Sequence, residues 1–282
     1  MKIIKNALIK NYTTYRLTGI IKEVVYPSNK EELIELLKNL KDKKYKVIGN
    51  GSNLIFLGDY DGTIIKLDSL NKLEIIDNIV NVEAGYNLMK LAIKTANYSL
   101  SGLEFASGIP ATVGGAIYMN AGAYNKEMKD VVKEVTIIDD NGNIKILANK
   151  ELKFAYRKSI LKEKNYICLG ATLKLEKGKK EEILDLIKSR KERRVATQPL
   201  NYPSAGSVFT NPKDDYAGRL IEEAGLKGCQ IGGALVSQKH ANFIINKNNA
   251  SGEDVKKLIE FIQKKIKKKY GVELKTEQEI VK

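Results

Sequence analysis

Apolar residues recur every three or four positions in several stretches of the chain, which is the spacing of one face of an α-helix. One stretch follows a predicted capping box formed by Ser251 and Asp254. Its apolar positions are Val255, Leu258, Ile259, Ile262 and Ile266. Further helices are predicted over 29–40, 88–95, 181–194 and 216–224. A capping box of Ser28 and Glu31 opens the first of these, and Asn87 caps the second.

Shorter apolar runs bounded by turn residues predict strands. They lie at 45–48, 63–67, 73–76, 79–83, 131–138, 144–147, 166–175, 233–236 and 242–245. Asn141-Gly142 falls between two of these runs and is typical of a hairpin turn. Helices and short strands are mixed without a sustained β-α-β alternation, so the pattern predicts an α+β fold. Pro199 and Pro203 interrupt the periodic pattern and predict a domain boundary.

Chain length and net charge add two expectations to these predicted elements. The chain has 282 residues, more than the roughly 100–200 of a typical domain, so two domains or one large one are expected. Its formal net charge is +14, but its basic residues are 42 Lys and only 6 Arg, spread along the chain. Nucleic-acid-binding proteins cluster basic residues and use Arg for paired contacts, so that class stays a disfavoured alternative.

Cysteine and histidine are scarce. The chain has Cys168, Cys229 and a single histidine, His240, too few for a Cys/His zinc site or a disulfide framework, and no metal is expected. Neither a targeting segment nor an apolar stretch of about 20 residues is found. We therefore expect a cytoplasmic protein with reduced cysteines and no membrane partner.

Two glycine-rich segments are the strongest candidates for chemistry. The first, Gly49-Asn50-Gly51-Ser52-Asn53, follows a predicted strand and could form a nest of backbone N–H groups for an anion, although a tight turn explains it equally. The second covers 102–124. It lies largely within 21 uncharged residues, 105–125, which suggests backbone packed closely against a flat or phosphorylated ligand.

These segments belong to an ordered set of motifs through which nearly the whole chain resembles the UDP-N-acetylenolpyruvoylglucosamine reductase family, flavoenzymes of peptidoglycan precursor synthesis. The motifs are Thr13-Thr14-Tyr15-Arg16, the segments 49–53 and 102–124, Tyr156-Arg157-Lys158-Ser159, Gln198-Pro199, Ser204-Ala205-Gly206-Ser207-Val208-Phe209, Ala224-Gly225-Leu226-Lys227-Gly228 and His240-Ala241-Asn242-Phe243. Segment 102–124 is shared in kind with a wider superfamily of FAD oxidases and dehydrogenases. The spacing from Arg157 to Ser207 is that of the shorter subtype.

The resemblance implies an α+β fold with a two-subdomain FAD-binding region of the vanillyl-alcohol-oxidase/PCMH type over 1–195, divided near 70–80. A smaller α+β substrate domain would cover 196–282. The residues expected to hold one noncovalent FAD are Gly49, Asn50, Gly51, Ser52, Asn53, Ser107, Gly108, Pro110, Gly114, Gly115, Ala116, Asn120, Gly122 and Arg194. For Arg194, a charge at a helix end stays the alternative.

Arg157, Ser207 and Glu277 match the catalytic positions of the family. Hydride addition to the terminal carbon of an enolpyruvyl ether leaves negative charge on the neighbouring carbon and its carboxylate. Arg157 and Glu277 would flank that charge, and Ser207 would donate the proton that completes the reduction.

Three residues are expected to contact the substrate. They are Tyr202, Asn211 and Asn242. Thr210 stands where the family usually has Lys, so this chain has no positively charged side chain at that position. Gln278 follows Glu277 where the family usually has a β-branched residue, and Glu273 and Glu279 therefore stay alternatives to Glu277.

The implied reaction is the NADPH-dependent reduction of UDP-N-acetylglucosamine enolpyruvate to UDP-N-acetylmuramate by a monomeric enzyme. FAD, NADPH and a UDP-sugar are all anionic, so the net positive charge could raise their local concentration. Another oxidase or dehydrogenase of the same FAD superfamily is the alternative among enzymes.

Overall fold

The computed structural model describes residues 1–282 and divides the chain into two compact units. Unit 1 consists of residues 1–4, 24–50 and 63–193, and unit 2 consists of residues 5–23, 51–62 and 194–282. Each unit is thus assembled from three separate stretches of chain. The functional domains 1–195 and 196–282 stay a prediction, because the compact units do not follow a single cut.

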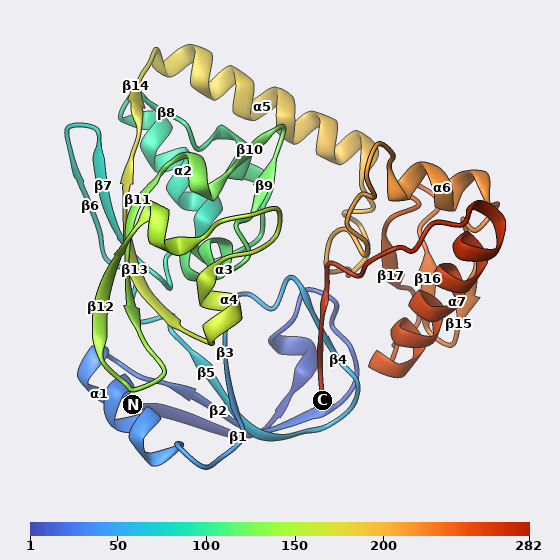
Figure 1. The fold of residues 1–282 in the computed structure, drawn as a ribbon, viewed down its shortest axis with the longest axis horizontal. Helices are drawn as coiled ribbons and strands as arrows, with labels where there is room; N and C mark the ends of the chain where they lie inside the picture. The colour runs from blue at the N-terminus through green and yellow to red at the C-terminus, as the bar shows by residue number, and fades with distance from the viewer. The chain divides into compact units, whose positions relative to one another are not determined.

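Unit 1 is organised around a five-stranded antiparallel sheet in the order β12-β11-β13-β7-β6 (Figure 1). Its strands are β6 (Leu73–Ile76), β7 (Ile79–Glu83), β11 (Val132–Ile138), β12 (Ile144–Ala148) and β13 (Ile167–Lys174). Helices α2 (Leu88–Asn97) and α3 (Val113–Tyr118) share one apolar core with this sheet. Leu91 and Ile117 from the helices and Val135 from the sheet are all fully buried there.

A second sheet has the order β1-β2-β5-β3. Its strands are β1 (Lys2–Leu8), β2 (Ile20–Tyr26), β3 (Tyr45–Ile48) and β5 (Tyr60–Lys66), and the chain passes between the units within β1, β2 and β5. Helix α1 (Lys30–Asn39) connects β2 to β3. Strands β3 and β5 run parallel with Ile48 opposite Lys66, so both strands end at the same edge.

Unit 2 contains a three-stranded sheet and two helices. These elements are β15 (Gln230–Ile231), β16 (Ala234–Val236), β17 (Ile244–Asn246), α6 (Ala217–Glu223) and α7 (Gly252–Tyr270). The predicted apolar stripe of α7 is confirmed, since all five of its residues are buried. Strand β18 (Glu279–Val281) pairs in parallel with β4 (Leu54–Phe56).

The three stretches of unit 2 are held together by hydrogen bonds and by one close approach of backbone. Asn246 Nδ2 donates to the carbonyl oxygens of Tyr15 at 3.0 Å and Arg16 at 2.9 Å. Gly252 opens α7 against β4, where a Cβ atom would lie 1.7 Å from the carbonyl oxygen of Phe56. Only glycine permits this close approach, so the last helix, β4 and the N-terminal stretch form one packed body.

The remaining elements are short apart from one long helix. They are β8 (Leu100–Ser101) paired with β14 (Glu176–Lys177), β9 (Gly122–Ala123) paired with β10 (Lys126–Glu127), α4 (Ile160–Lys164) and α5 (Lys180–Thr197). Single 3₁₀ turns lie at Ile9–Asn11, Glu104–Gly108, Met128–Asp130 and Asn149–Leu152.

Local sequence signals predict most of these elements correctly. Strands β3, β6 and β7 have the predicted bounds. Asn87 caps α2 by accepting from Lys90 N, and the Ser251–Asp254 capping box of α7 is confirmed. The sequence pattern misses β1, β2, β18 and the two-residue strands, and it does not predict the short helices α3 and α4 (Ile160–Lys164).

The predicted capping box at the start of α1 is wrong by one residue. Asn29 is the N-cap and accepts from Glu32 N at 2.9 Å. The carboxylate of Glu32, and not that of Glu31, accepts from Ser28 N at 2.9 Å. Asn and Ser cap helices almost equally well, so the sequence alone does not choose between registers that differ by one residue.

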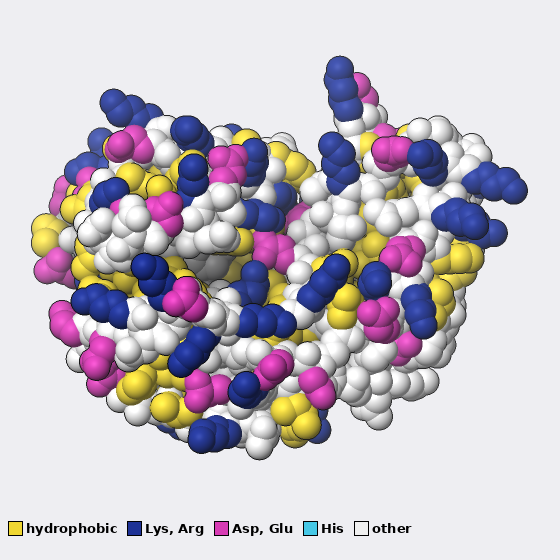
Figure 2. All heavy atoms as spheres, turned by 60° about the horizontal axis from the view of Figure 1, so that its bottom comes forward, with side chains coloured by type: hydrophobic (Ala, Val, Ile, Leu, Met, Phe, Trp, Pro, Cys, Tyr) yellow, Lys and Arg dark blue, Asp and Glu magenta, His cyan; other side chains and the backbone are white.

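Basic and acidic side chains are interspersed on one face of the molecule (Figure 2). On the face shown in Figure 2, Lys and Arg side chains alternate with Asp and Glu side chains. This arrangement agrees with the scattered lysines of the sequence. None of the helices has both the length and the apolar character needed to cross a bilayer.

The hairpin between β11 and β12 predicts a pH dependence of stability. The buried Asp139 carboxylate forms an ion pair with Lys145 at 2.5 Å and accepts from Asn143 N and Asn141 N, each at 2.9 Å. The hydrogen bond from Lys145, followed by those from the backbone, lowers the pKa of Asp139 to about 2 from an ordinary value of 3.8. Above pH 4 this carboxylate stabilises the fold. As the pH falls towards 2, the unfolded chain takes up a proton first, and the stabilisation is lost.

We expect Asp139→Asn to lower the urea midpoint of unfolding at pH 7, and the difference from the wild type to shrink as the pH falls from 5 to 2. Glu182→Gln is the control and should leave the urea midpoint nearly unchanged. Glu182 and Lys179 form an exposed ion pair, and such pairs contribute little to the free energy of unfolding. A difference between Asp139→Asn and the wild type that stays constant with pH would contradict this account.

Candidate active site

The two predicted cofactor segments meet within unit 1. Asn50 Nδ2 donates to the carbonyl oxygen of Pro110 at 3.2 Å. Gly49 lies so close to Thr112 that a Cβ on Gly49 would be 2.5 Å from Thr112 Oγ1. The first part of the turn is therefore packed against the start of α3, as a joint binding surface requires.

A buried cation supports the same turn. Lys66 Nζ donates to the carbonyl oxygen of Gly49 at 2.5 Å and lies 3.3 Å from Asp68 Oδ1, and the Lys66 side chain is only 9% exposed. The parallel register of β3 and β5 produces this contact, because Ile48 and Lys66 are opposite one another. The sequence does not reveal Lys66 as a site residue, since its meaning depends on that pairing.

Residues 105–124 of the glycine-rich segment are half-buried or buried and carry no charge. Gly114, Gly115 and Ala116 lie in α3, which Thr112 caps, and Ser107 and Gly108 end the preceding 3₁₀ turn. Gly115 is half-buried, and a Cβ on it would approach only Thr112 Oγ1, at 3.4 Å. Main chain is thus accessible at this point of the segment.

Two predicted residues of this segment have roles within the protein. The fully buried Asn120 donates to Glu127 Oε2 at 2.5 Å and to the carbonyl oxygen of Ala155 at 3.0 Å, while its own oxygen accepts from Lys129 N. Gly122 could not carry a side chain, because a Cβ there would lie 2.5 Å from the carbonyl oxygen of Lys126. Their assignment to a cofactor stays a prediction.

Arg157 is held in a defined orientation in unit 1. Its Nη2 donates to the carbonyl oxygen of Gly122 at 3.0 Å, and its guanidinium lies 4.8 Å from the centre of the Tyr156 ring. Its backbone has a φ of 57°, in the left-handed region that a residue with a side chain adopts at a cost of roughly 1 kcal/mol.

Unit 2 brings Ser207 and Glu277 onto neighbouring segments, although they are 70 positions apart in sequence. Phe209 and Thr276 form an antiparallel bridge. On its two sides, Glu277 N donates to the carbonyl oxygen of Val208 at 2.8 Å, and Thr210 N donates to that of Lys275 at 3.0 Å. The two predicted catalytic residues of this unit therefore share one hydrogen-bonded ribbon.

The second half of the glycine-rich turn belongs to this same unit. Asn53 Nδ2 donates to the carbonyl oxygen of Glu277 at 3.1 Å. Gly51 has a φ of 61°, and a Cβ there would lie 2.2 Å from the carbonyl oxygen of Tyr12, so glycine is required. Ser52 follows in the half-buried part of the turn, and Arg194 is half-buried in the last turn of α5.

Asn242 and Tyr202 each have a partner inside unit 2. Asn242 is only 4% exposed, and its amide accepts from Phe209 N at 2.9 Å and donates to the Phe209 carbonyl oxygen at 2.8 Å. This amide positions the ribbon that carries Ser207, and a direct substrate contact by Asn242 stays a prediction. Tyr202 is half-buried, with Lys247 Nζ 4.4 Å from its ring centre and 2.5 Å from its hydroxyl.

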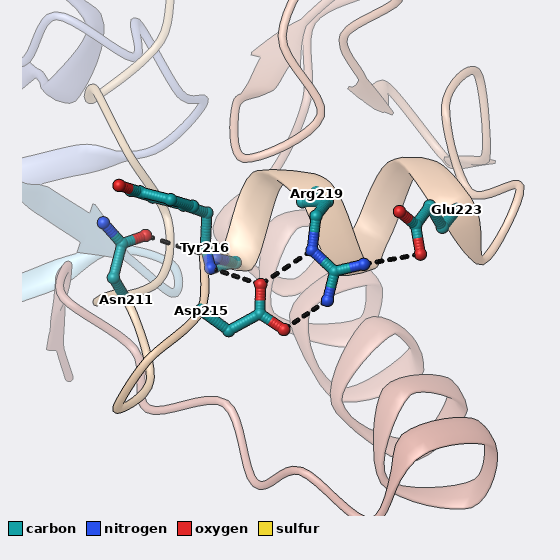
Figure 3. Close-up of polar contacts among 6 residues, drawn as sticks. Asn211, Asp215, Tyr216, Arg219 and Glu223 are labelled. Atoms are coloured by element: carbon teal, nitrogen blue, oxygen red, sulfur yellow. Dashed lines mark hydrogen bonds and ion pairs between the residues drawn. The ribbon is translucent and has the colours of Figure 1, made fainter.

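Asn211 lies at the start of α6 in Figure 3, where its Oδ1 accepts from Ala217 N at 3.2 Å. Nearby, Arg219 is flanked by two carboxylates. Its Nε donates to Asp215 Oδ1 at 2.8 Å and its Nη1 to Glu223 Oε2 at 2.6 Å (Figure 3). Two acidic partners neutralise this arginine, so it does not replace the cationic side chain expected at position 210.

Comparison with known proteins matches both parts of the chain to known domains. Residues 198–281 match the C-terminal domain of UDP-N-acetylenolpyruvoylglucosamine reductase, and residues 21–148 match an FAD binding domain. The chain is 48% identical to the UDP-N-acetylenolpyruvoylglucosamine reductase of Caldanaerobacter subterraneus subsp. tengcongensis, over 99% of this chain and 94% of that protein. It is 42% identical to the Bacillus subtilis enzyme of that name over the same shares.

The crystal structure of UDP-N-acetylenolpyruvylglucosamine reductase from Thermus caldophilus matches with a TM-score of 0.86 and 36% identity, over the whole of both chains. This match and the FAD binding domain confirm the predicted α+β fold with an FAD-binding region. The chain is an oxidoreductase with a role in the reduction of a peptidoglycan precursor. It belongs to the UDP-N-acetylenolpyruvoylglucosamine reductase family.

Proposed function

We propose that the protein uses NADPH to reduce UDP-N-acetylglucosamine enolpyruvate to UDP-N-acetylmuramate, with Ser207 as the proton donor. The observation that carries this proposal is the ribbon of unit 2, in which the segments of Ser207 and Glu277 are hydrogen-bonded to one another. The enzyme would act as a monomer in the cytoplasm, with residues 1–195 serving FAD and residues 196–282 serving the substrate.

The residues of unit 1 fit FAD. The turn at Gly49 and Asn50 is joined to Pro110, the segment 105–125 has no acidic residue to repel a pyrophosphate, and the buried Lys66 adds a cation beside the turn. The predicted glycines of the segment, with Ser107, would bind the group through main chain and hydroxyl. When bound, FAD supplies the relay that takes hydride from NADPH and delivers it to the terminal enolpyruvyl carbon.

Ser207 completes the reduction by donating its hydroxyl proton to the carbon that carries the ether oxygen. A serine is a weak acid in water, so this step relies on the strong basicity of that carbon after hydride addition and on the placement of the hydroxyl. The positive φ of Gly206, 72°, turns the chain immediately before Ser207. The bridge at Phe209 then fixes the chain immediately after it.

Arg157 and Glu277 would stabilise the negative charge that develops on the enolpyruvyl carboxylate and the neighbouring carbon. The guanidinium of Arg157 is already oriented by Gly122, so little reorganisation is needed at the moment of reaction. Glu277 can contribute only as the protonated acid, which donates a hydrogen bond. Tyr202, Asn211 and Asn242 would provide the substrate-binding surface of unit 2.

Flavin spectroscopy tests the overall reaction. We expect purified protein to be yellow, with its flavin absorbance bleached by NADPH and restored by the enolpyruvyl substrate. Rapid reoxidation by oxygen without any response to this substrate would instead favour another flavin-dependent oxidase. Colourless protein that cannot take up FAD would exclude the proposal.

Ser207→Ala tests the proton donor. The variant should keep its rate of flavin reduction by NADPH, because that step needs no proton from Ser207. Reoxidation by the enolpyruvyl substrate should slow by about 10²–10⁴-fold, the usual contribution of a positioned acid. Ser204→Ala, three positions earlier in the same loop, is the control and should reoxidise normally. An unaltered reoxidation rate in Ser207→Ala would remove Ser207 from the mechanism.

Gly49→Ala tests the assignment of the glycine-rich turn to FAD. The new Cβ would displace Thr112 and the start of α3, so we expect FAD to bind about tenfold more weakly, which corresponds to ~1.4 kcal/mol. Titration of the apoprotein with FAD measures this directly. Gly58→Ala is the matched control, because a Cβ on Gly58 has no neighbour within 4 Å. Equal affinity in the two variants would argue against the turn as a binding element.

A further inference from the structure

We propose that Gln278 is a positioning residue for Ser207, acting through the backbone of Ala205 and Gly206. Gln278 is 4% exposed, and its Nε2 donates to the carbonyl oxygens of Ala205 at 3.0 Å and Gly206 at 3.2 Å. These are the last two carbonyl groups before the proposed proton donor. The inference rests on the proposed function of Ser207.

The backbone of Gln278 is held on both sides. Glu277 N donates to the carbonyl oxygen of Val208, and Glu279 N donates to that of Asn53, each at 2.8 Å. Gln278 is therefore the residue at which the C-terminal segment changes partners, from the Ser207 ribbon to β4. A side chain on such a fixed backbone has little freedom to move away from the loop that it holds.

The Gly206 turn needs an external restraint of this kind. Its φ of 72° lies in a region that glycine visits freely, and a Cβ on Gly206 would meet nothing within 4 Å, so packing does not confine the turn. The two hydrogen bonds from Gln278 confine it instead. They hold the peptide units on both sides of Gly206 and thereby the direction in which the Ser207 side chain leaves the backbone.

The Gln278 amide also has a buried neighbour. Burial raises the pKa of the fully buried Tyr15, and a hydrogen bond with the Gln278 side chain opposes part of that rise. Water cannot replace the two donated hydrogen bonds at such a site, so removing the amide donor would leave the carbonyl groups of Ala205 and Gly206 without this restraint.

Gln278→Met tests the inference, because Met has a similar length and fills the same space without a donor. We expect flavin reduction by NADPH to be unchanged and reoxidation by the enolpyruvyl substrate to slow about tenfold to a hundredfold, the effect of a small misplacement of a reacting group. Gln263→Met is the matched control. It removes one amide bond, to the carbonyl oxygen of Leu274 at 2.9 Å, from the same C-terminal segment and should leave both half-reactions unchanged.

The double variant Ser207→Ala with Gln278→Met separates positioning from a general loss of structure. If Gln278 acts through Ser207, the double variant should reoxidise as slowly as Ser207→Ala alone, within about twofold. Two outcomes would overturn the role of Gln278 and leave the proposed function intact. In the first, the slowing in the double variant equals the product of the slowing in the two single variants. In the second, Gln278→Met reoxidises normally while Ser207→Ala is slow. Normal reoxidation in Ser207→Ala would overturn both.

A second substitution and a second measurement cover the case in which Gln278→Met does not fold. Gln278→Leu also lacks the amide donor, and it should likewise slow reoxidation by the enolpyruvyl substrate while leaving flavin reduction by NADPH unchanged. In either variant, a misplaced Ser207 makes proton transfer slower relative to hydride transfer. Reoxidation should therefore slow more in D₂O than it does in the wild type, and an unaltered solvent isotope effect would contradict positioning.

Discussion

The hydrogen bonds of residues 275–281 are the constraint on which the proposed catalytic part of the protein depends. This short segment pairs first with residues 208–210 and then in parallel with β4. It therefore joins the loop of Ser207 to a strand from a distant part of the sequence. Without these bonds the segments of Ser207 and Glu277 would not be held side by side, and Ser207 would lose the placement that the proposed proton transfer requires.

The two units place their predicted functional residues in a similar way. In unit 1 the turn at Gly49 and the segment at Pro110 are loops supported by strand ends and a short helix. In unit 2 Ser207 lies on a loop supported by Asn242 and Gln278, whose amides bind backbone groups. Loops on rigid elements allow main chain to approach ligands closely while their positions stay defined.

Sequence analysis succeeds where the determining interaction is local. The caps at Asn87 and Ser251 and the apolar stripe of α7 depend on residues within a few positions of one another, and all are confirmed. Strand β18 escapes prediction because its three residues gain their meaning only by pairing with β4, more than 200 positions away. Lys66 is missed for the same reason, since its role depends on the parallel pairing of β3 and β5.

In the candidate site, too, sequence motifs identify which residues to consider. They do not show which groups the side chains of these residues bind, because most of the partners lie far away in the sequence. Asn120 and Asn242 are expected as ligand contacts, yet both amides are hydrogen-bonded to other groups of the protein. In the sequence, Gln278 is only a departure from the family pattern. Its hydrogen bonds to the carbonyl oxygens of Ala205 and Gly206 exist only in the folded chain, which brings residues more than 70 positions apart into contact.

Each unit consists of three separate stretches of chain, and this limits how the protein can be divided into fragments. A fragment of residues 196–282 would omit the stretches 5–23 and 51–62, and with them β4 and the carbonyl partners of Asn246. Such a fragment would expose apolar and polar groups that normally bury one another, so it should be insoluble when expressed alone. A useful dissection would instead rearrange the order of the chain, joining the three stretches of unit 2 by new linkers.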